Sequence, residues 1–537
     1  MTDKLLVQSE VKSISQGLSH GVALLQGGRV DEAVEFGESL AALYPEEARV
    51  HAFVAEAYNA RGCFDVALNW IDKAILQDEN LQHKLKKAWL LSRAYRRDEV
   101  SALIEEVVAS ANVDGRVLWQ AGKLYYHHNQ LPQAIDCYER ALAVGGEHPG
   151  WLYDLGLALF YSGNYVRAEE CLDRVLTTAP HAGSVHYLRS TLRKQTRDSN
   201  HVAELESRLR MGVKRDEDEA GMLYALAKEL EDLGDYDKAF AVLQAGASKK
   251  RGAIRYDAQK AINSLREIQS HTHAQNLANA VSGHEGAGAI FIVGMPRTGT
   301  TLTERILLQS GNVRNAGELS DFDALLTRAM LEEREKDPAL SPTEAALRVD
   351  FEVLGRKYMR GARQMVGGSS MFIDKMPVNY LYCGMIHKAL PDARIVHLVR
   401  DPLDTCYAIY KTLFFDAYEF SYDQDELAEY YIAYRRLMQH WHETMPGVIL
   451  DVSYESLVTD TEAQARRIYA WCGLEWTPRA LETPGKSDVY ATASAAQVRE
   501  PVHSRSVNSS RRYERELAPL VRKLTAAGLL EIASTSS

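Results

Sequence analysis

Small and apolar residues recur at a fixed spacing along the first 250 residues of the chain. A glycine or asparagine is followed two positions later by an apolar or aromatic residue, and five positions later by alanine. The pattern begins at Gly28, Gly62, Asn129, Gly163 and Gly234. These starting points lie 34, 67, 34 and 71 residues apart, so a unit of about 34 residues repeats. The two longer gaps leave room for degenerate copies near Arg96 and Arg197.

Each repeat is predicted to be two helices joined by a tight turn. Glycine permits the left-handed backbone that such a turn needs, and the alanine lets the second helix pack closely on the first. Pro45 and Pro180 each follow a starting glycine by 17 residues, where proline would end the second helix. A helical unit of this length resembles the tetratricopeptide repeat. We therefore expect an all-α helical repeat array over residues 15–250.

Two uses of such an array stay open. Its concave groove would bind a peptide or protein partner, as solenoids often do. Alternatively, the helices form a scaffold that packs on the rest of the chain or makes a homodimer. The sequence does not show what occupies the groove.

The pattern of apolar residues changes after the array. Residues 251–288 are interpreted as a helical transition that ends in a glycine-rich linker. Residues 289–293 form a short, continuous apolar run, and residues 394–399 form another. Such runs are typical of buried parallel strands. We expect residues 289–535 to form an α/β domain with a central parallel sheet, of the kind built around a phosphate-binding loop.

A glycine-bounded loop joins the first predicted strand to a helix. Residues 294–301 read Gly-Met-Pro-Arg-Thr-Gly-Thr-Thr. In the helix that follows, Leu302 and Ile306 are predicted on the apolar face, with Glu304 and Arg305 opposite. The N–H groups of such a loop and the N-terminus of its helix converge on a phosphate.

The spacing of this loop matches the phosphate loop of nucleotide hydrolases, with one decisive difference. The lysine that those enzymes place at the β- and γ-phosphates is Thr300 here, which argues against a kinase or an ATP- or GTP-hydrolysing enzyme. Arg297, inside the loop, adds a bidentate donor for a bound anion. A second basic residue, Arg400, ends the strand at 394–399, where parallel strands point into a ligand crevice.

The net charge, the cysteine spacing and the lack of long apolar segments exclude several classes of function. The formal net charge of −11 argues against nonspecific nucleic-acid binding. The six cysteines include no Cys-x-x-Cys pair, so neither a zinc site nor a disulfide framework is indicated. The sequence shows no signal peptide and no apolar stretch long enough for a bilayer, which predicts a cytoplasmic protein without a membrane partner.

The loop at 294–301 and the sequence Arg400-Asp401-Pro402 resemble the cofactor-binding motifs of one enzyme family. They are similar to those of sulfotransferases that use 3′-phosphoadenosine 5′-phosphosulfate (PAPS), above all the tyrosylprotein branch and its bacterial relatives with tetratricopeptide repeats. The resemblance implies a loop that holds the 5′-phosphosulfate and an Arg400 that holds the 3′-phosphate, with no metal. It implies cofactor binding by Pro296, Arg297, Thr298, Gly299, Thr300, Thr301, Arg400 and Tyr454.

The same resemblance implies the catalytic groups. Glu318 matches the general base, which removes the proton of an acceptor hydroxyl. Lys375, Ser494 and Arg297 match groups that stabilise charge on the oxygens of the leaving group. A histidine base, as in sulfotransferases that act on small molecules, is not favoured. His397, for example, lies inside a predicted strand as an expected core residue.

The sequence departs from the family at two places. Ala408 stands where the family has a serine that donates to the 3′-phosphate. The sequence Asn508-Ser509-Ser510 replaces a glycine, a basic residue and a tryptophan. Both changes put the affinity for the 3′-phosphate in question, and Arg511 or Arg512 could compensate.

These features predict a PAPS-dependent sulfotransferase that acts on an acceptor hydroxyl. The acceptor would be a tyrosine in a peptide, a glycan or a small hydroxylated molecule, because one fold serves many acceptors. The aromatic stretch at residues 414–420 would wall an acceptor pocket or lie in the core. The alternative is a catalytically degraded, sulfotransferase-like scaffold that binds partners through its repeats.

Overall fold

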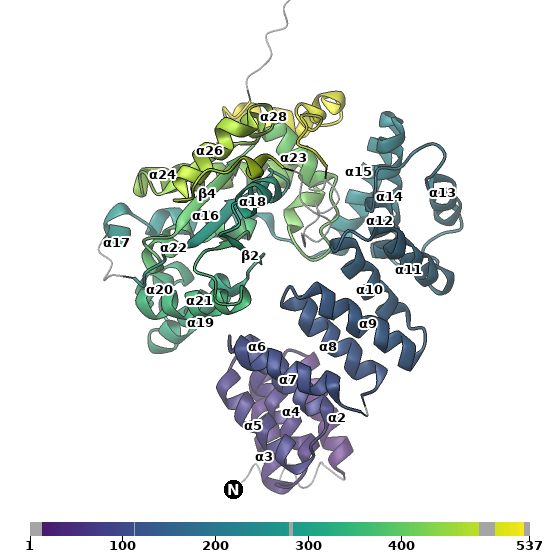
Figure 1. The fold of residues 1–537 in the computed structure, drawn as a ribbon, viewed down its shortest axis with the longest axis vertical. Helices are drawn as coiled ribbons and strands as arrows, with labels where there is room; N and C mark the ends of the chain where they lie inside the picture. The colour runs from purple at the N-terminus through teal and green to yellow at the C-terminus, as the bar shows by residue number, and fades with distance from the viewer. Residues whose placement is uncertain (1–12, 112, 279–282, 483–499, 531–537) are drawn as a thin grey trace, which may run out of the picture. The chain divides into compact units, whose positions relative to one another are not determined.

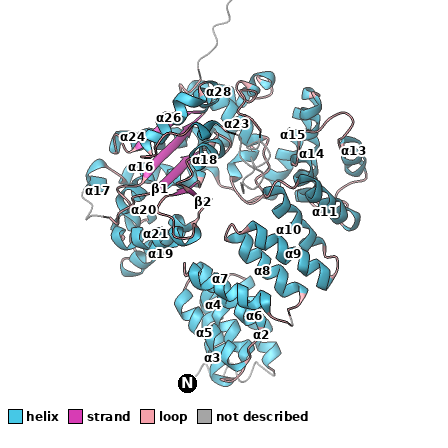
Figure 2. Cartoon of the chain, in the orientation of Figure 1, coloured by secondary structure: helices cyan, strands magenta, loops and turns pink. Residues whose placement is uncertain are grey.

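The computed structural model describes residues 13–111, 113–278, 283–482 and 500–530. The chain divides into two compact units. The first ends at Trp151 and the second begins at Leu152, so the boundary between them falls within the repeat array. The first unit is built of helices, shown in purple and blue in Figure 1 and as cyan coils in Figure 2. They are α2 (Ile14–Gln26), α3 (Val30–Leu43), α4 (Ala48–Ala60), α5 (Phe64–Gln77), α6 (Leu81–Arg93), α7 (Arg97–Ala109), α8 (Gly115–His127) and α9 (Leu131–Gly145).

The second unit continues the array and then changes to α/β. Helix α10 (Pro149–Tyr161) spans the boundary between the units. The helices that follow are α11 (Tyr165–Thr178), α12 (Gly183–Thr191), α13 (Val202–Arg210), α14 (Asp216–Leu233), α15 (Tyr236–Ala253), α16 (Ala258–His271) and α17 (Ala274–Ala278).

The turns confirm the repeat predicted from the sequence. All five starting residues have a left-handed backbone, with φ between 58° at Asn129 and 87° at Gly234. The five alanines of the pattern are buried: Ala33, Ala67, Ala134, Ala168 and Ala239. The degenerate copy expected near Arg96 is the helix pair α6 and α7, which meet at Tyr95, where φ is 59°.

A five-stranded parallel sheet forms the centre of the α/β part, in magenta in Figure 2. Its strands, in spatial order, are β2 (Arg314–Gly317), β3 (Phe372–Asp374), β1 (Ala289–Gly294), β4 (Arg394–Val399) and β5 (Ile449–Ser453). All four pairings are parallel, so every strand ends at the same edge. The predicted fold class is confirmed.

Helices cover both faces of this sheet. The α-helices are α18 (Thr300–Leu308), α19 (Asp321–Lys336), α20 (Pro342–Arg348), α21 (Phe351–Met365), α22 (Cys383–Ala389), α23 (Pro402–Tyr410), α24 (Gln424–Thr444), α25 (Tyr454–Thr459), α26 (Thr461–Trp471) and α28 (Ala518–Ala526). Successive side chains of a strand point to opposite faces. Accordingly, Ile290 joins the core beneath α18 and α26, whereas Phe291 stacks on Tyr358 of α21 with ring centroids 5.5 Å apart.

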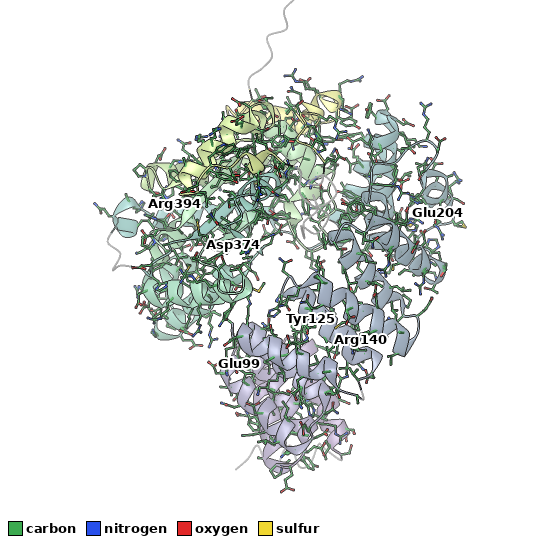
Figure 3. The ribbon with its side chains drawn as sticks, in the orientation of Figure 1. Glu99, Tyr125, Arg140, Glu204, Asp374 and Arg394 are labelled. Atoms are coloured by element: carbon green, nitrogen blue, oxygen red, sulfur yellow. The ribbon has the colours of Figure 1, made fainter. Side chains whose placement is uncertain are left out.

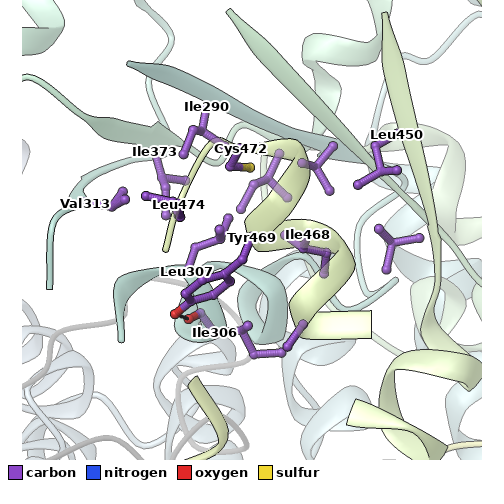
Figure 4. Close-up of a cluster of buried hydrophobic side chains, with 14 of the residues drawn as sticks. Ile290, Ile306, Leu307, Val313, Ile373, Leu450, Ile468, Tyr469, Cys472 and Leu474 are labelled. Atoms are coloured by element: carbon purple, nitrogen blue, oxygen red, sulfur yellow. Dashed lines mark hydrogen bonds between the residues drawn. The ribbon is translucent and has the colours of Figure 1, made fainter. Parts of the chain in front are cut away.

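The core on the first face holds the phosphate-loop helix in place. Figure 4 shows Ile306 and Leu307 of α18 packed with Ile468 and Tyr469 of α26 against side chains from the strands. The Tyr469 hydroxyl donates a hydrogen bond to the Ile306 carbonyl oxygen over 2.8 Å. A buried carbonyl near the end of a helix needs such a partner.

Replacing Tyr469 by phenylalanine is expected to lower the free energy of unfolding by about 1 kcal/mol. The substitution removes one hydroxyl and leaves the Ile306 carbonyl without that donor, while the ring still fills its place in the core. The midpoint of thermal unfolding measures the effect. An unchanged midpoint would show that water replaces the hydroxyl at no cost.

The last repeats pack directly on the α/β part of the second unit. The Tyr224 hydroxyl of α14 donates to the Tyr410 carbonyl oxygen over 3.1 Å. Tyr407 of α23 donates to Glu231 of α14 over 2.7 Å, and Lys411 pairs with the same carboxylate. Residues 152–253 thus form one compact body with the sheet. Within the described part of the chain, no helix has the length and apolar character needed to cross a membrane.

Candidate active site

The loop between β1 and α18 is shaped by three unusual backbone conformations. Gly294, Arg297 and Gly299 have φ values of 146°, 69° and 101°. A Cβ atom on Gly299 would lie 2.6 Å from Tyr454 Cδ2, so this position has no room for a side chain. The Thr298 hydroxyl donates to the Met295 carbonyl oxygen over 2.7 Å and closes the turn. Helix α18 then begins at Thr300, with the N–H groups of its first turn facing the loop.

A cavity of about 530 Å³ opens beside this loop. The loop contributes Arg297, Gly299, Thr300 and Thr301, and the end of β4 contributes Arg400. The carboxyl edge of a parallel sheet is where ligands of α/β proteins bind. The two halves of the anion site predicted from the sequence therefore meet in one cavity, although they lie about a hundred residues apart in the chain.

Arg400 is buried and held from several sides. It donates to the Arg297 carbonyl oxygen over 3.0 Å and to the Ser506 carbonyl oxygen over 2.5 Å. Its guanidinium lies 4.8 Å from the centre of the Tyr454 ring. Among the described residues, none accepts a hydrogen bond from its buried Nε. A buried guanidinium with a donor to spare fits an anionic ligand.

The other predicted cofactor residues divide into three groups. Tyr454 and Arg512 line the cavity, and the Arg512 guanidinium lies 4.5 Å from the centre of the Tyr236 ring. Pro296 and Thr298 are buried within the loop and support its shape. Arg511 is exposed, and it is not among the described residues that line the cavity. Ser494, which was predicted to be catalytic, lies outside the described residues.

Both departures from the family pattern reach this cavity. Ala408 and Ser509 line it. The segment around Ser509 is held by Asp404, which is 1% exposed and accepts from Asn508 N over 2.6 Å and from Ser510 N and Oγ over 2.8 and 2.7 Å. Asp404 also lies 3.7 Å from Arg400 and so ties the C-terminal segment to the basic end of β4.

Glu318 and Lys375 form an ion pair at the ends of neighbouring strands. Lys375 Nζ donates to Glu318 Oε1, and the backbone N–H of Lys375 donates to the Gly317 carbonyl oxygen over 2.9 Å. Lys375 is 2% exposed, whereas the Glu318 side chain is 37% exposed. Burial lowers the pKa of Lys375, but the carboxylates of Glu318 and Glu304 outweigh it and raise that pKa above its ordinary value. The pair is therefore a fixed ammonium beside a carboxylate that solvent can reach.

Two residues of α18 correct the sequence analysis. Glu304 and Arg305 were expected opposite the apolar face, but they are 1% and 2% exposed. The packing of the loop helix against other segments buries both faces, and Arg305 donates to the Glu500 carbonyl oxygen over 2.9 Å. Burial, together with Glu318 and against the pull of Lys375, raises the pKa of Glu304 to about 7.

Glu304→Gln is expected to stabilise the protein at pH 8 by on the order of 2 kcal/mol and to change little at pH 5. The folded pKa of about 7 lies above the ordinary value of 4.5. Between pH 4.5 and pH 7, Glu304 keeps its proton in the folded protein but has lost it in the unfolded chain. The free energy of unfolding therefore falls as the pH rises through this range. Glutamine removes that loss. Thermal unfolding at both pH values measures the effect, with the exposed Glu335→Gln as control; an equal gain at both would contradict the assignment.

Tyr418, in the aromatic stretch at 414–420, interacts electrostatically with Glu318. Burial, with a contribution from the Glu318 carboxylate, raises the pKa of Tyr418 above its ordinary value. Tyr418 also has a left-handed backbone with φ of 53°, a costly conformation for an aromatic residue. Its ring lies 4.7 Å from that of Phe414. Tyr418 and Phe414 therefore form an aromatic pair, and Tyr418 lies within electrostatic range of the carboxylate.

Comparisons with known proteins agree with this geometry. Residues 289–478 match the model of the sulfotransferase family, and residues 120–183 match that of the tetratricopeptide repeat. The chain carries a sulfotransferase-family domain and tetratricopeptide repeats. An uncharacterized protein of Aquifex aeolicus is 28% identical over 525 residues, which cover 93% of this chain and 68% of that protein.

Two solved structures are each similar to less than half of the chain. The sulfotransferase domain of the Synechococcus PCC 7002 olefin synthase is 18% identical, with a TM-score of 0.34, over 46% of this chain and 97% of that one. The C-terminal part of a repeat protein from Cytophaga hutchinsonii is 17% identical, with a TM-score of 0.33, over 42% of this chain and 93% of that one.

Several contacts of the sulfotransferase domain could not be expected from its sequence. The anchoring role of Asp404 depends on a segment about a hundred residues away. Glu231 and Lys194 of the repeats line the same cavity as the phosphate loop, so the array supplies part of its wall. The one available signal for Asp404 was its position in the first turn of α23, close behind Arg400 in the sequence.

Proposed function

We propose that this protein is a PAPS-dependent sulfotransferase that transfers a sulfonyl group to an acceptor hydroxyl. The observation that carries the proposal is the single cavity shared by the lysine-free phosphate loop and Arg400. A nucleotide with phosphates at both its 5′ and 3′ ends needs two anion sites in one pocket. The sulfotransferase-family match over residues 289–478 supports the same conclusion.

The loop and the surrounding cations would hold the donor. Arg297, Thr300 and Thr301 line the cavity and would surround the 5′-phosphosulfate. Arg400 would bind the 3′-phosphate through its Nε, which is unpaired among the described residues. Arg512 faces the same cavity and supplies a positive charge near Ala408. When bound, the donor supplies a sulfonyl group on a good leaving group, an adenosine bisphosphate.

Glu318 and Lys375 would provide the transfer chemistry. Glu318 takes the proton of the acceptor hydroxyl as the new S–O bond forms. Lys375 stabilises the charge that develops on the phosphate oxygen as its bond to sulfur breaks. Their ion pair raises the pKa of Lys375 and so keeps its ammonium charged before the donor arrives. Ser494 stays a predicted contributor outside the described residues.

The acceptor is proposed to be a hydroxyl that fits an aromatic wall. Tyr418 interacts electrostatically with Glu318 and packs on Phe414, which favours the phenol of a tyrosine in a peptide over a purely aliphatic alcohol. A glycan or small hydroxylated molecule would use fewer of these contacts. The repeats would bind the protein that carries the acceptor, or another protein partner, in their groove.

Calorimetric titration with adenosine 3′,5′-bisphosphate, with ATP as control, tests the donor site. We expect micromolar binding of the bisphosphate and at least tenfold weaker binding of ATP, because the loop lacks the lysine for a β- or γ-phosphate. Equal binding of both would contradict a PAPS site. Binding of neither would show that Ala408 and Ser509 have disabled the site, and would favour a degraded scaffold.

A further inference from the structure

Two histidines and an aspartate meet on the sheet face that lies away from the phosphate-loop helix. His397 of β4 and Asp451 of β5 are paired residues of neighbouring strands. His397 Nδ1 lies 2.7 Å from Asp451 Oδ1, and His442 Nε2, from the last turn of α24, lies 2.9 Å from the same oxygen. One ligand atom from each residue lies within 4.8 Å of the others.

We propose that His397, His442 and Asp451 form a binding site for a divalent transition metal ion of the zinc type. Two imidazole nitrogens and one carboxylate oxygen are ligands that Zn²⁺ commonly takes, with bonds of about 2.0 to 2.2 Å. This site is separate from the transfer chemistry, for which no metal is needed, and it does not depend on the proposed function.

The geometry needs only a small rearrangement to accept an ion. Ligand atoms around a tetrahedral zinc lie roughly 3.3 Å apart, given the bond lengths above. The two hydrogen-bonded pairs would widen by about half an ångström, and the imidazoles would close on the ion. His397 is fixed in the sheet and 2% exposed, whereas His442 and Asp451 are 35% and 46% exposed. The exposed pair can move, and water can complete the coordination from that side.

An outer group already orients the buried ligand. His397 Nε2 is hydrogen-bonded to the Tyr434 hydroxyl, which leaves Nδ1 facing Asp451. Tyr434 in turn accepts a hydrogen bond from the backbone N–H of Met295, at the start of the phosphate loop. Histidines that bind metals nearly always have such a partner on the second ring nitrogen, because it fixes the ring and its tautomer. A core histidine needs no carboxylate and second histidine on its other side.

Two features of the site weaken the binding of a metal ion. Arg435 lies close enough to interact electrostatically with all three ligands, and its positive charge disfavours a cation. The ion must also displace the proton shared between each imidazole and Asp451. If these costs prevail, the three residues form only a closed hydrogen-bonded cluster.

Calorimetric titration of the full-length protein with Zn²⁺ distinguishes a metal site from a hydrogen-bonded cluster that binds no ion. We expect one equivalent to bind, and His442→Ala to weaken that binding at least tenfold. The control is His148→Ala, which removes an exposed imidazole from the repeat array. Zinc should also raise the thermal midpoint of the wild type and of His148→Ala, but not that of His442→Ala. Equal binding by His442→Ala and the wild type would overturn the proposal.

Two further variants separate coordination from loss of structure. Tyr434→Phe keeps every ligand and removes only the outer hydrogen bond, so zinc affinity should fall by about ten- to a hundredfold. Asp451→Asn keeps the shape of the side chain but not its charge, and should abolish the signal. In each variant, Co²⁺ absorption in the visible range should weaken in parallel with zinc affinity. A Co²⁺ spectrum identical in the wild type and Asp451→Asn would exclude this site.

Discussion

Replacing Glu318 by glutamine is expected to lower turnover by two orders of magnitude or more, within the usual range for a general base. The amide can still accept a hydrogen bond from Lys375, so the local structure is kept, but it cannot take a proton from an acceptor. Turnover is measured as adenosine 3′,5′-bisphosphate formed from PAPS with a tyrosine-containing peptide as acceptor.

The controls for this variant separate chemistry from binding. The affinity for adenosine 3′,5′-bisphosphate should stay within about twofold of the wild type, since Glu318 is not among the described residues that line the donor cavity. Glu335→Gln, an exposed carboxylate on α19, should leave both quantities unchanged. Wild-type turnover in Glu318→Gln would remove Glu318 from the mechanism.

Local spacing explains why the loop between β1 and α18 was predictable. A phosphate loop is made of consecutive residues, and its glycines permit backbone conformations that other residues rarely adopt, as the φ of 101° at Gly299 shows. The repeat could be predicted in the same way, because each turn needs a residue that tolerates a left-handed backbone and each helix pair needs a small residue where the helices pack. In both cases the physical cause lies within a few residues of its effect.

Other features depend on how distant segments come together. The pairing of Glu318 with Lys375 follows from the adjacency of β2 and β3, and the sequence alone does not give the order of strands. The burial of Glu304 and Arg305 follows from segments packed on the outer side of α18, which reverses the expectation from helical periodicity. His397 was expected to be a core residue, and it is buried; its partners Asp451 and His442 came from tertiary structure.

Replacing Arg400 by alanine is expected to weaken the binding of adenosine 3′,5′-bisphosphate about a hundredfold. Hydrogen bonds to charged groups contribute about 1.5 to 3 kcal/mol each. The Arg400 guanidinium is buried at the cavity wall, and its Nε donates to no described residue. Calorimetric titration measures the loss. Arg394→Ala serves as the matched control, because Arg394 (labelled in Figure 3) begins the same strand at its opposite, exposed end.

The nucleotide itself provides the sharper test of what Arg400 binds. Arg400 also donates to the Arg297 and Ser506 carbonyl oxygens, so alanine could weaken binding by loosening the loop. Adenosine 5′-monophosphate lacks the 3′-phosphate but keeps every other contact. If Arg400 holds the 3′-phosphate, Arg400→Ala should weaken the bisphosphate about a hundredfold and the monophosphate by less than about threefold, a coupling that only a direct contact explains. If the affinities for both nucleotides fall equally, Arg400 supports the loop and does not bind the 3′-phosphate. Arg512 would then be the better candidate for the 3′-phosphate site.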